Sequence, residues 1–97
     1  MIEDNSPHKI IRKEICFRGH VQGVGFRYRA KYAAGGCGVT GWVKNEWDGS
    51  VLMEAQGTNE QINEMLKLIN QSPYIQIEDM NYHEIPVVEY ERGFHVR

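Results

Sequence analysis

The chain has 97 residues, of which 41% are hydrophobic and 25% are charged, and it carries eleven basic and thirteen acidic side chains. This length suits one small domain and is too short for two separate cores. The formal charge of -2 argues against a protein that coats nucleic acid, because phosphate neutralisation needs a clear basic excess. No window approaches ~18 consecutive apolar residues, so we expect no transmembrane helix and no membrane partner.

The ends of the chain and its cysteines indicate where the protein resides. The start lacks the apolar stretch of a secretory signal, so we expect a flexible tail over residues 1–9 and one domain over residues 10–97. Cys16 and Cys37 form no CxxC motif. We interpret them as buried free thiols rather than a disulfide, which favours the reducing cytoplasm.

The first third of the chain predicts a strand, a loop and a helix. Hydrophobic alternation predicts a strand over residues 9–18, and three glycines predict a loop over residues 19–25. From Phe26, apolar residues at helical spacing predict a helix that ends at Gly35 and Gly36. The residues expected to face the core are Ile15, Phe17, Phe26, Ala30, Ala33 and Cys37.

A hairpin is expected next. Residues 39–46 predict a strand, Asp48 and Gly49 predict a tight turn, and alternation from Val51 predicts the returning strand. The residues expected to share the buried face of the hairpin are Val39, Gly41, Val43, Val51, Met53 and Ala55.

The rest of the chain completes a recognisable order of elements. A capping box of Thr58 and Gln61 begins a second amphipathic helix, and strands are predicted within residues 76–85 and 93–97. The apolar stripe of this helix is Ile62, Met65, Leu66 and Ile69. The order β-α-β-β-α-β with a small final strand predicts an α+β ferredoxin-like split βαβ sandwich, in which two helices cover one face of an antiparallel sheet.

The start of the first helix lacks the residues that usually stabilise a helix N-terminus. Val24 and Gly25 offer no side-chain acceptor, and the first turn contains Arg27 and then Arg29 but no acid. A cation at this position costs about 0.3–1 kcal/mol. Loop N–H groups and Arg27 together favour an anion, most naturally a phosphate. The alternative is a solvated helix start whose Arg27 pairs with a distant acid.

Asn45 is a second candidate site residue. It shares a face with Val43 near the end of its strand, and its amide can orient a water molecule without ionising. The alternative is an asparagine that hydrogen-bonds the backbone of the turn at Asp48 and Gly49, and the pattern by itself favours that alternative. The histidines show no metal-ligand spacing, and the glycine-rich loop contains no Ser or Cys nucleophile, so we expect no metal and no other cofactor.

Two long motifs resemble those of the acylphosphatase family. Residues 19–27, GHVQGVGFR, resemble the phosphate-binding loop of that family. Residues 41–45, GWVKN, followed by Gly49, Val51 and Gly57, resemble its second signature. The similarity extends from about Lys13 to Arg97.

The resemblance implies an enzyme that hydrolyses the carboxyl-phosphate bond of acyl phosphates without a metal. Inorganic phosphate is then both product and competitor. By matching position, Arg27 is the phosphate-binding arginine and Asn45 the residue that positions water. The main-chain cradle for the substrate comprises His20, Val21, Gln22, Gly23 and Val24. We expect a monomer.

The chain departs from the family pattern at two places. Phe17 replaces an aliphatic residue, which is a change of packing. Gly35, Gly36 and Cys37 replace a well-formed helix end, so we expect lower stability but preserved activity.

Two other functions and one set of aromatic residues complete the interpretation of the sequence. A non-catalytic anion-binding module, like the similar domain of hydrogenase maturation proteins, is disfavoured because the chain lacks additional domains. An RNA-binding module is disfavoured because the strand that begins at Val51 carries no aromatic residue. We interpret four large aromatics as ordinary packing rather than as a contact surface, namely Trp47, Tyr74, Tyr82 and Tyr90.

Overall fold

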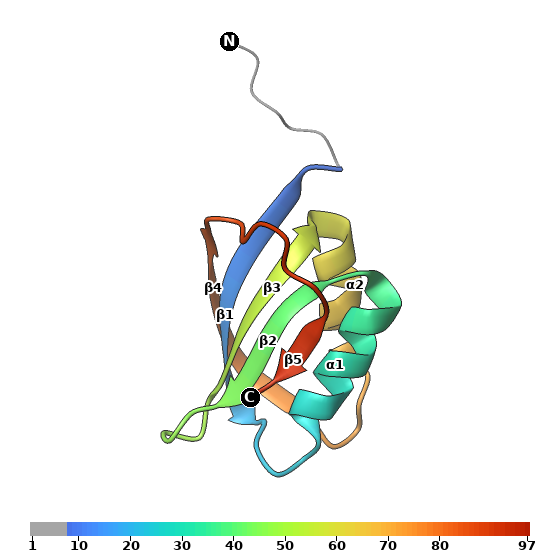
Figure 1. Ribbon diagram of the computed structural model, residues 1–97. Coiled ribbons are helices and arrows are strands. Elements are labelled where there is room, and N and C mark those ends of the chain that lie inside the picture. Colours follow the sequence, from blue (N-terminus) through green and yellow to red (C-terminus); the bar gives the residue numbers. More distant parts are fainter. Residues whose placement is uncertain (1–7) are drawn as a thin grey trace.

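The protein, seen here in a computed structural model that describes residues 8–97, is a two-layer sandwich. The predicted tail therefore lies largely outside the described residues. A five-stranded sheet of order β4-β1-β3-β2-β5 forms one layer, and both helices cover the same face of it (Figure 1). The elements are β1 Ile10–His20, α1 Phe26–Cys37, β2 Thr40–Asn45, β3 Val51–Thr58, α2 Asn59–Asn70, β4 Gln76–Ile85 and β5 Phe94–Val96. This arrangement confirms the predicted α+β ferredoxin-like fold.

The sheet is mixed rather than wholly antiparallel. The pairs β1–β3, β1–β4 and β2–β3 are antiparallel, whereas β5 lies parallel to β2, with Gly41 opposite Phe94. The short β5 can run parallel because the long connection after β4 crosses the end of the sheet before β5 begins (Figure 1). The direction of β5 was not specified by its sequence pattern.

The predicted inward faces form the core. The expected faces of β1, β2 and β3 are buried, including Ile15, Phe17, Val43, Val51 and Met53. Phe17 packs against Phe26 of α1 with ring centroids 4.8 Å apart, so the aromatic replacement on β1 anchors the start of that helix.

The second helix begins at the predicted capping box. Gln61 N donates to Thr58 Oγ1 at 3.1 Å, and Thr58 N donates to Gln61 Oε1 at 2.8 Å. Its apolar stripe faces the core, with Ile62, Met65 and Ile69 fully buried.

The end of the first helix differs from its prediction. α1 continues through Gly35 and Gly36, and its cap is Gly38, which adopts a left-handed φ of 74°. Val39 N donates to Ala34 O at 2.9 Å across this cap. The helix ends at Gly38 and not at Gly35, because only at Gly38 does the backbone need a positive φ.

Two other predictions need correction. β1 extends through Gly19 and His20, which pair with β4, so the loop before α1 is shorter than expected. The large aromatics expected to be packed are exposed: Trp47 97%, Tyr74 73%, Tyr82 58% and Tyr90 94%. Polar turns and an edge strand carry them, and no second layer covers these parts of the surface.

Cys16 and Cys37 are free, as predicted, although both are half-buried rather than buried. Within residues 8–97, no helix combines the length and apolar character needed to cross a membrane.

A buried ionic cluster holds the connection between β4 and β5. Arg12 is 1% exposed, and its Nη1 and Nη2 donate to the two carboxylate oxygens of Glu91 at 2.7 and 3.1 Å. Its Nε donates to Glu54 Oε1 at 2.8 Å. Burial by itself would raise the pKa of Glu91, but the hydrogen bonds and charge of Arg12 outweigh it and hold this pKa below its usual range. The cluster fixes the path of the chain toward β5.

Candidate active site

A small cavity lies between the β1–α1 loop, the start of α1 and the last residue of β2. The loop and this end of β2 lie at the same end of the sheet (Figure 1). Its volume is about 180 Å³. The residues that line it are Val21, Gly23, Gly25, Phe26, Arg27, Tyr28 and Asn45. The cavity therefore combines the loop, the helix start and the end of β2.

The helix start is uncapped by any side chain, as the sequence predicted. Gly25 is the N-cap residue with a left-handed backbone (φ 79°, ψ 16°), and no acid lies in the first turn. Gly23 also has a positive φ of 73°, whereas Val24 between them does not. Alternation between right- and left-handed backbone directs successive N–H groups toward a common point in anion-binding nests, and the positive φ values of Gly23 and Gly25 fit this pattern. The positive end of the helix dipole adds to its preference for an anion.

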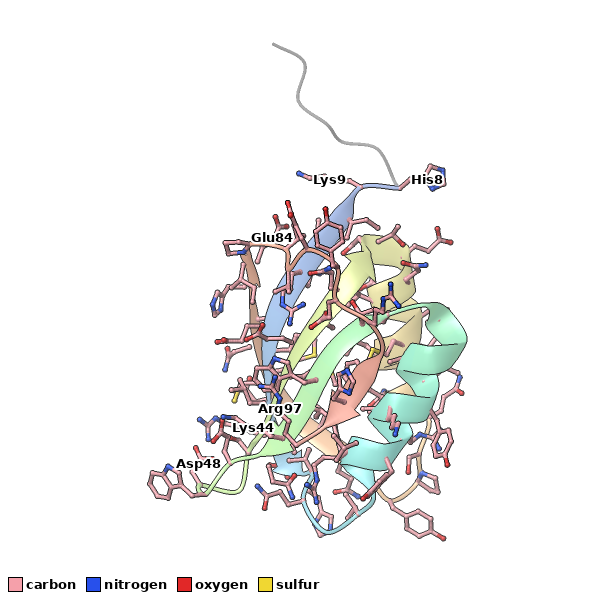
Figure 2. The ribbon with its side chains drawn as sticks, in the orientation of Figure 1. His8, Lys9, Lys44, Asp48, Glu84 and Arg97 are labelled. Carbon is pink, nitrogen blue, oxygen red and sulfur yellow. The ribbon has the colours of Figure 1, made fainter. Side chains whose placement is uncertain are left out.

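Arg27 is oriented by the C-terminal strand. Its Nη1 donates to the main-chain oxygen of Arg97 at 2.9 Å. Arg97 follows β5, and its guanidinium stacks on Trp42 of β2 at 4.5 Å; Figure 2 shows Arg97 beside Lys44 at this end of the sheet. Within residues 8–97 no acidic side chain forms an ion pair with Arg27, so the alternative of a distant acid is wrong. The guanidinium has five N–H donors, and several stay available for a ligand.

Asn45 is the last residue of β2 and is exposed where it lines the cavity. In the part of the chain that the structure describes, its amide makes no hydrogen bond to the hairpin turn, so the alternative that we favoured on pattern alone is also wrong. The turn is satisfied by Asp48, whose Oδ1 accepts from Ser50 N at 3.0 Å and from Ser50 Oγ at 2.6 Å. These hydrogen bonds lower the pKa of Asp48. The amide of Asn45 is thus left to face the cavity.

Gln22 connects the loop to the hairpin. Its Nε2 donates to Glu46 O at 2.7 Å and to Ser50 O at 2.8 Å. Both amide hydrogens are therefore used in fixing the hairpin that carries Asn45. Sequence reasoning assigned only the main chain of Gln22 to the site, although an amide side chain in a glycine-rich loop is a signal of such a bridge.

The predicted site residues divide into two groups. Four line the cavity, namely Arg27, Asn45, Val21 and Gly23. Three do not line it: His20 pairs with β4, Gln22 contacts the hairpin, and Val24 packs against the core. Sequence reasoning missed Tyr28, which lines the cavity directly after Arg27. In residues 8–97, no group of three or more His, Cys, Asp or Glu side chains is arranged to hold a metal ion.

The fold is an α+β sandwich, and its candidate anion-binding site is built from a loop, a helix start and one arginine. The family model for acylphosphatase matches residues 13–96, and the chain belongs to the acylphosphatase family.

Relatives and solved structures agree with this assignment. The acylphosphatase of Oceanobacillus iheyensis is 43% identical over 74 residues, which cover 74% of this chain and 81% of the relative. That of Bifidobacterium longum is 39% identical over 90 residues, covering 91% and 93%. The crystal structure of acylphosphatase from Bacillus subtilis superposes with a TM-score of 0.81 at 32% identity, covering 90% of this chain and 98% of that one.

The fold also occurs inside a much larger protein. Full-length HypF superposes with a TM-score of 0.77 at 23% identity, and the match covers 93% of this chain but 12% of that one. At this identity the likeness concerns the fold alone.

Proposed function

We propose that the protein is an acylphosphatase that hydrolyses the carboxyl-phosphate bond of acyl phosphates at this cavity. The single observation that carries the proposal is the meeting of Arg27, the nest before α1 and Asn45 around one cavity of about 180 Å³. Family membership supports the same reaction class.

Arg27 and the loop N–H groups bind the phosphoryl oxygens. Their hydrogen bonds strengthen as negative charge develops in the transition state, and they need no reorganisation because Gly23, Gly25 and the Arg97 main-chain oxygen already fix their directions. Removing one such donor typically costs about 3–4 kcal/mol, or a hundred- to a thousandfold in rate.

Asn45 holds the attacking water. The water oxygen forms a bond to phosphorus while the bond between phosphorus and the acyl oxygen breaks, and the carboxylate leaves with that electron pair. The proton of the water passes to a phosphoryl oxygen of the substrate. A carboxylate is already a good leaving group, so no general acid is required, whereas an alkoxide from a simple phosphate ester would need one.

Hydrolysis of benzoyl phosphate tests this proposal. Arg27→Ala and Asn45→Ala are each expected to lower kcat/KM at least a hundredfold with the fold intact by circular dichroism. Arg27→Lys should fail similarly, because one ammonium cannot replace the planar fork of a guanidinium. Arg92→Ala and Asn63→Ala are the matched controls, because they remove the same two residue types at exposed positions outside the cavity. Both should leave activity unchanged.

The outcomes separate the candidate functions. More than a tenth of the activity remaining in Arg27→Ala or Asn45→Ala would contradict the assigned roles. Wild-type protein that binds phosphate in calorimetry but turns over no benzoyl phosphate would instead be a non-catalytic anion-binding module. Inorganic phosphate should compete with substrate, and EDTA should have no effect, because every role is assigned to groups of the chain itself.

The setting of the enzyme completes the proposal. We place it in the cytoplasm, because both Cys16 and Cys37 are free thiols of the kind that a reducing compartment maintains. We also expect it to be a monomer. Sedimentation should then give the mass of one chain, 11.2 kDa.

A further inference from the structure

A largely exposed tyrosine is among the residues that line the cavity. Tyr28 is 60% exposed and lines the cavity with Arg27 and Asn45, and the proposed binding of phosphate does not use its side chain. We infer that the ring of Tyr28 is the contact surface for the acyl group, so that the site favours acyl phosphates with an aromatic or large apolar acyl group. This inference rests on the proposed function.

The size of the cavity carries the first step of the argument. About 180 Å³ is below the roughly 300 Å³ at which sites for drug-sized molecules begin. A phosphoryl group and its water take up much of such a cavity, which leaves little room inside it for a benzoyl group. We therefore expect a large acyl group to extend beyond the cavity and lie on the surface beside it.

The geometry of the reaction carries the second step. In-line displacement places the attacking water and the leaving oxygen on opposite sides of phosphorus. The water is held by Asn45, which belongs to the sheet layer. The leaving oxygen then lies on the side of phosphorus opposite the water that Asn45 holds.

Tyr28 belongs to the helix layer, whereas Asn45 belongs to the sheet layer, and both line the cavity. At 3.6 residues per turn, Tyr28 lies about 200° around α1 from Phe26, which is buried against the sheet. Ala30, on the buried side with Phe26, is also fully buried, so the ring of Tyr28 is on the outer face of the helix start. An acyl group leaving away from Asn45 meets this ring and gains apolar and aromatic contact.

Substrate preference is the measurement that tests the inference. We would compare kcat/KM for benzoyl phosphate with kcat/KM for acetyl phosphate, whose methyl group is too small to reach the ring. Tyr28→Ala is expected to lower the ratio of kcat/KM for benzoyl phosphate to kcat/KM for acetyl phosphate about five- to tenfold. The drop should come from a higher KM for benzoyl phosphate, while kcat/KM for acetyl phosphate changes less than twofold. A tenfold change corresponds to about 1.4 kcal/mol.

Two further variants isolate the ring. Tyr28→Phe keeps the ring and loses the hydroxyl, so it should retain the wild-type ratio within twofold. Tyr32 lies one turn further along the same helix, is 80% exposed and does not line the cavity. Tyr32→Ala should therefore leave kcat/KM unchanged for both substrates.

Each contrary result has a distinct meaning. An unchanged ratio in Tyr28→Ala would overturn the inference, and so would an equal loss for both substrates, which would place Tyr28 in phosphate binding. A loss in Tyr28→Phe as large as in Tyr28→Ala would assign the effect to the hydroxyl and overturn it as well. Failure of the wild-type protein to hydrolyse either substrate would overturn the proposed function itself, and is recognised before any variant is compared.

Discussion

Removing the hydrogen bonds from Gln22 to the hairpin should lower the rate of hydrolysis more than it lowers stability. Gln22→Met keeps the length of the side chain and removes its two donated hydrogen bonds, to Glu46 O and Ser50 O. Both carbonyls keep a main-chain partner, since Glu46 O accepts from Gly49 N at 3.2 Å and Ser50 O from Glu46 N at 2.9 Å. No buried acceptor is orphaned, so the loss in unfolding free energy should be about 1–2 kcal/mol, near 1 kcal/mol per bond.

The expected loss of rate follows from the position of the bridge. Gln22 lies between two loop residues that line the cavity, and Glu46 directly follows Asn45. Without the bridge, the water held by Asn45 is no longer fixed relative to the phosphoryl group, and a misplacement of about 1 Å can cost a hundredfold. We expect kcat for benzoyl phosphate to fall at least tenfold, while KM changes less than threefold because Arg27 and the loop N–H groups still bind the phosphate.

A matched control distinguishes positioning from general destabilisation. Gln56, at the other end of the sheet, also makes two hydrogen bonds with main-chain atoms, both of Val88, and accepts a third from Arg12 Nη1. Gln56→Met should lower the urea midpoint by a similar or larger amount and leave kcat unchanged. The reasoning fails if Gln22→Met keeps kcat within twofold of wild type, or if both variants lose rate in proportion to stability.

Three further predictions concern stability, measured by urea denaturation. Gly36→Ala should raise the unfolding free energy by about 0.4–1 kcal/mol, because the residue is helical and an added Cβ meets nothing within 4 Å. Gly41→Ala should lower it by roughly 3 kcal/mol or more, because φ is 141° and the Cβ would lie 1.8 Å from Glu54 O. Glu91→Ala should cost about 3 kcal/mol at pH 7, because it leaves Arg12 buried with one carboxylate fewer. Folding lowers the pKa of Glu91. The contribution of the ionised Glu91 to the unfolding free energy is therefore complete above the unfolded-state pKa of about 4.5, and it is lost as the pH falls through the lower folded-state pKa.

Each of the three stability predictions has a control variant or a result that would contradict it. Gly35→Ala, equally open in the helix, should match Gly36→Ala, and a loss of stability in both would contradict the helical assignment of the two glycines. Full stability in Gly41→Ala would contradict the close approach to β3. Glu89→Ala, at an exposed carboxylate of the same connection, should cost little at any pH. A Glu91→Ala deficit that persists undiminished at pH 3 would contradict the ionised pair.

Much of the fold could be predicted because its signals are local. Alternation marked the inward residues of β1, β2 and β3, and the capping box at Thr58 marked the start of α2. These patterns depend on the two- and 3.6-residue periods of the backbone, which act within a few residues. The helix end at Gly38 was missed for a related reason: three nearby glycines can all supply a left-handed cap, and the local pattern does not select one of them.

Much of the candidate site could also be predicted, because an uncapped helix start with Arg27 conflicts with helix electrostatics within a single turn. What could not be predicted depends on residues far apart in the chain. Arg27 meets Arg97, and Gln22 meets Ser50, only after the sheet has formed. Tyr28 likewise gains its proposed role only from the cavity that it lines.

The sequence by itself therefore determined the order of elements and their buried faces, and it predicted the anion preference of one helix start, since each arises from short-range backbone geometry and charge. The tertiary structure alone decided that β5 runs parallel to β2, that Arg12 is buried under the last connection, and that Asn45 faces the nest rather than its own turn. These features depend on contacts between distant segments, whose distances are set by the packing of the whole sheet rather than by any local pattern.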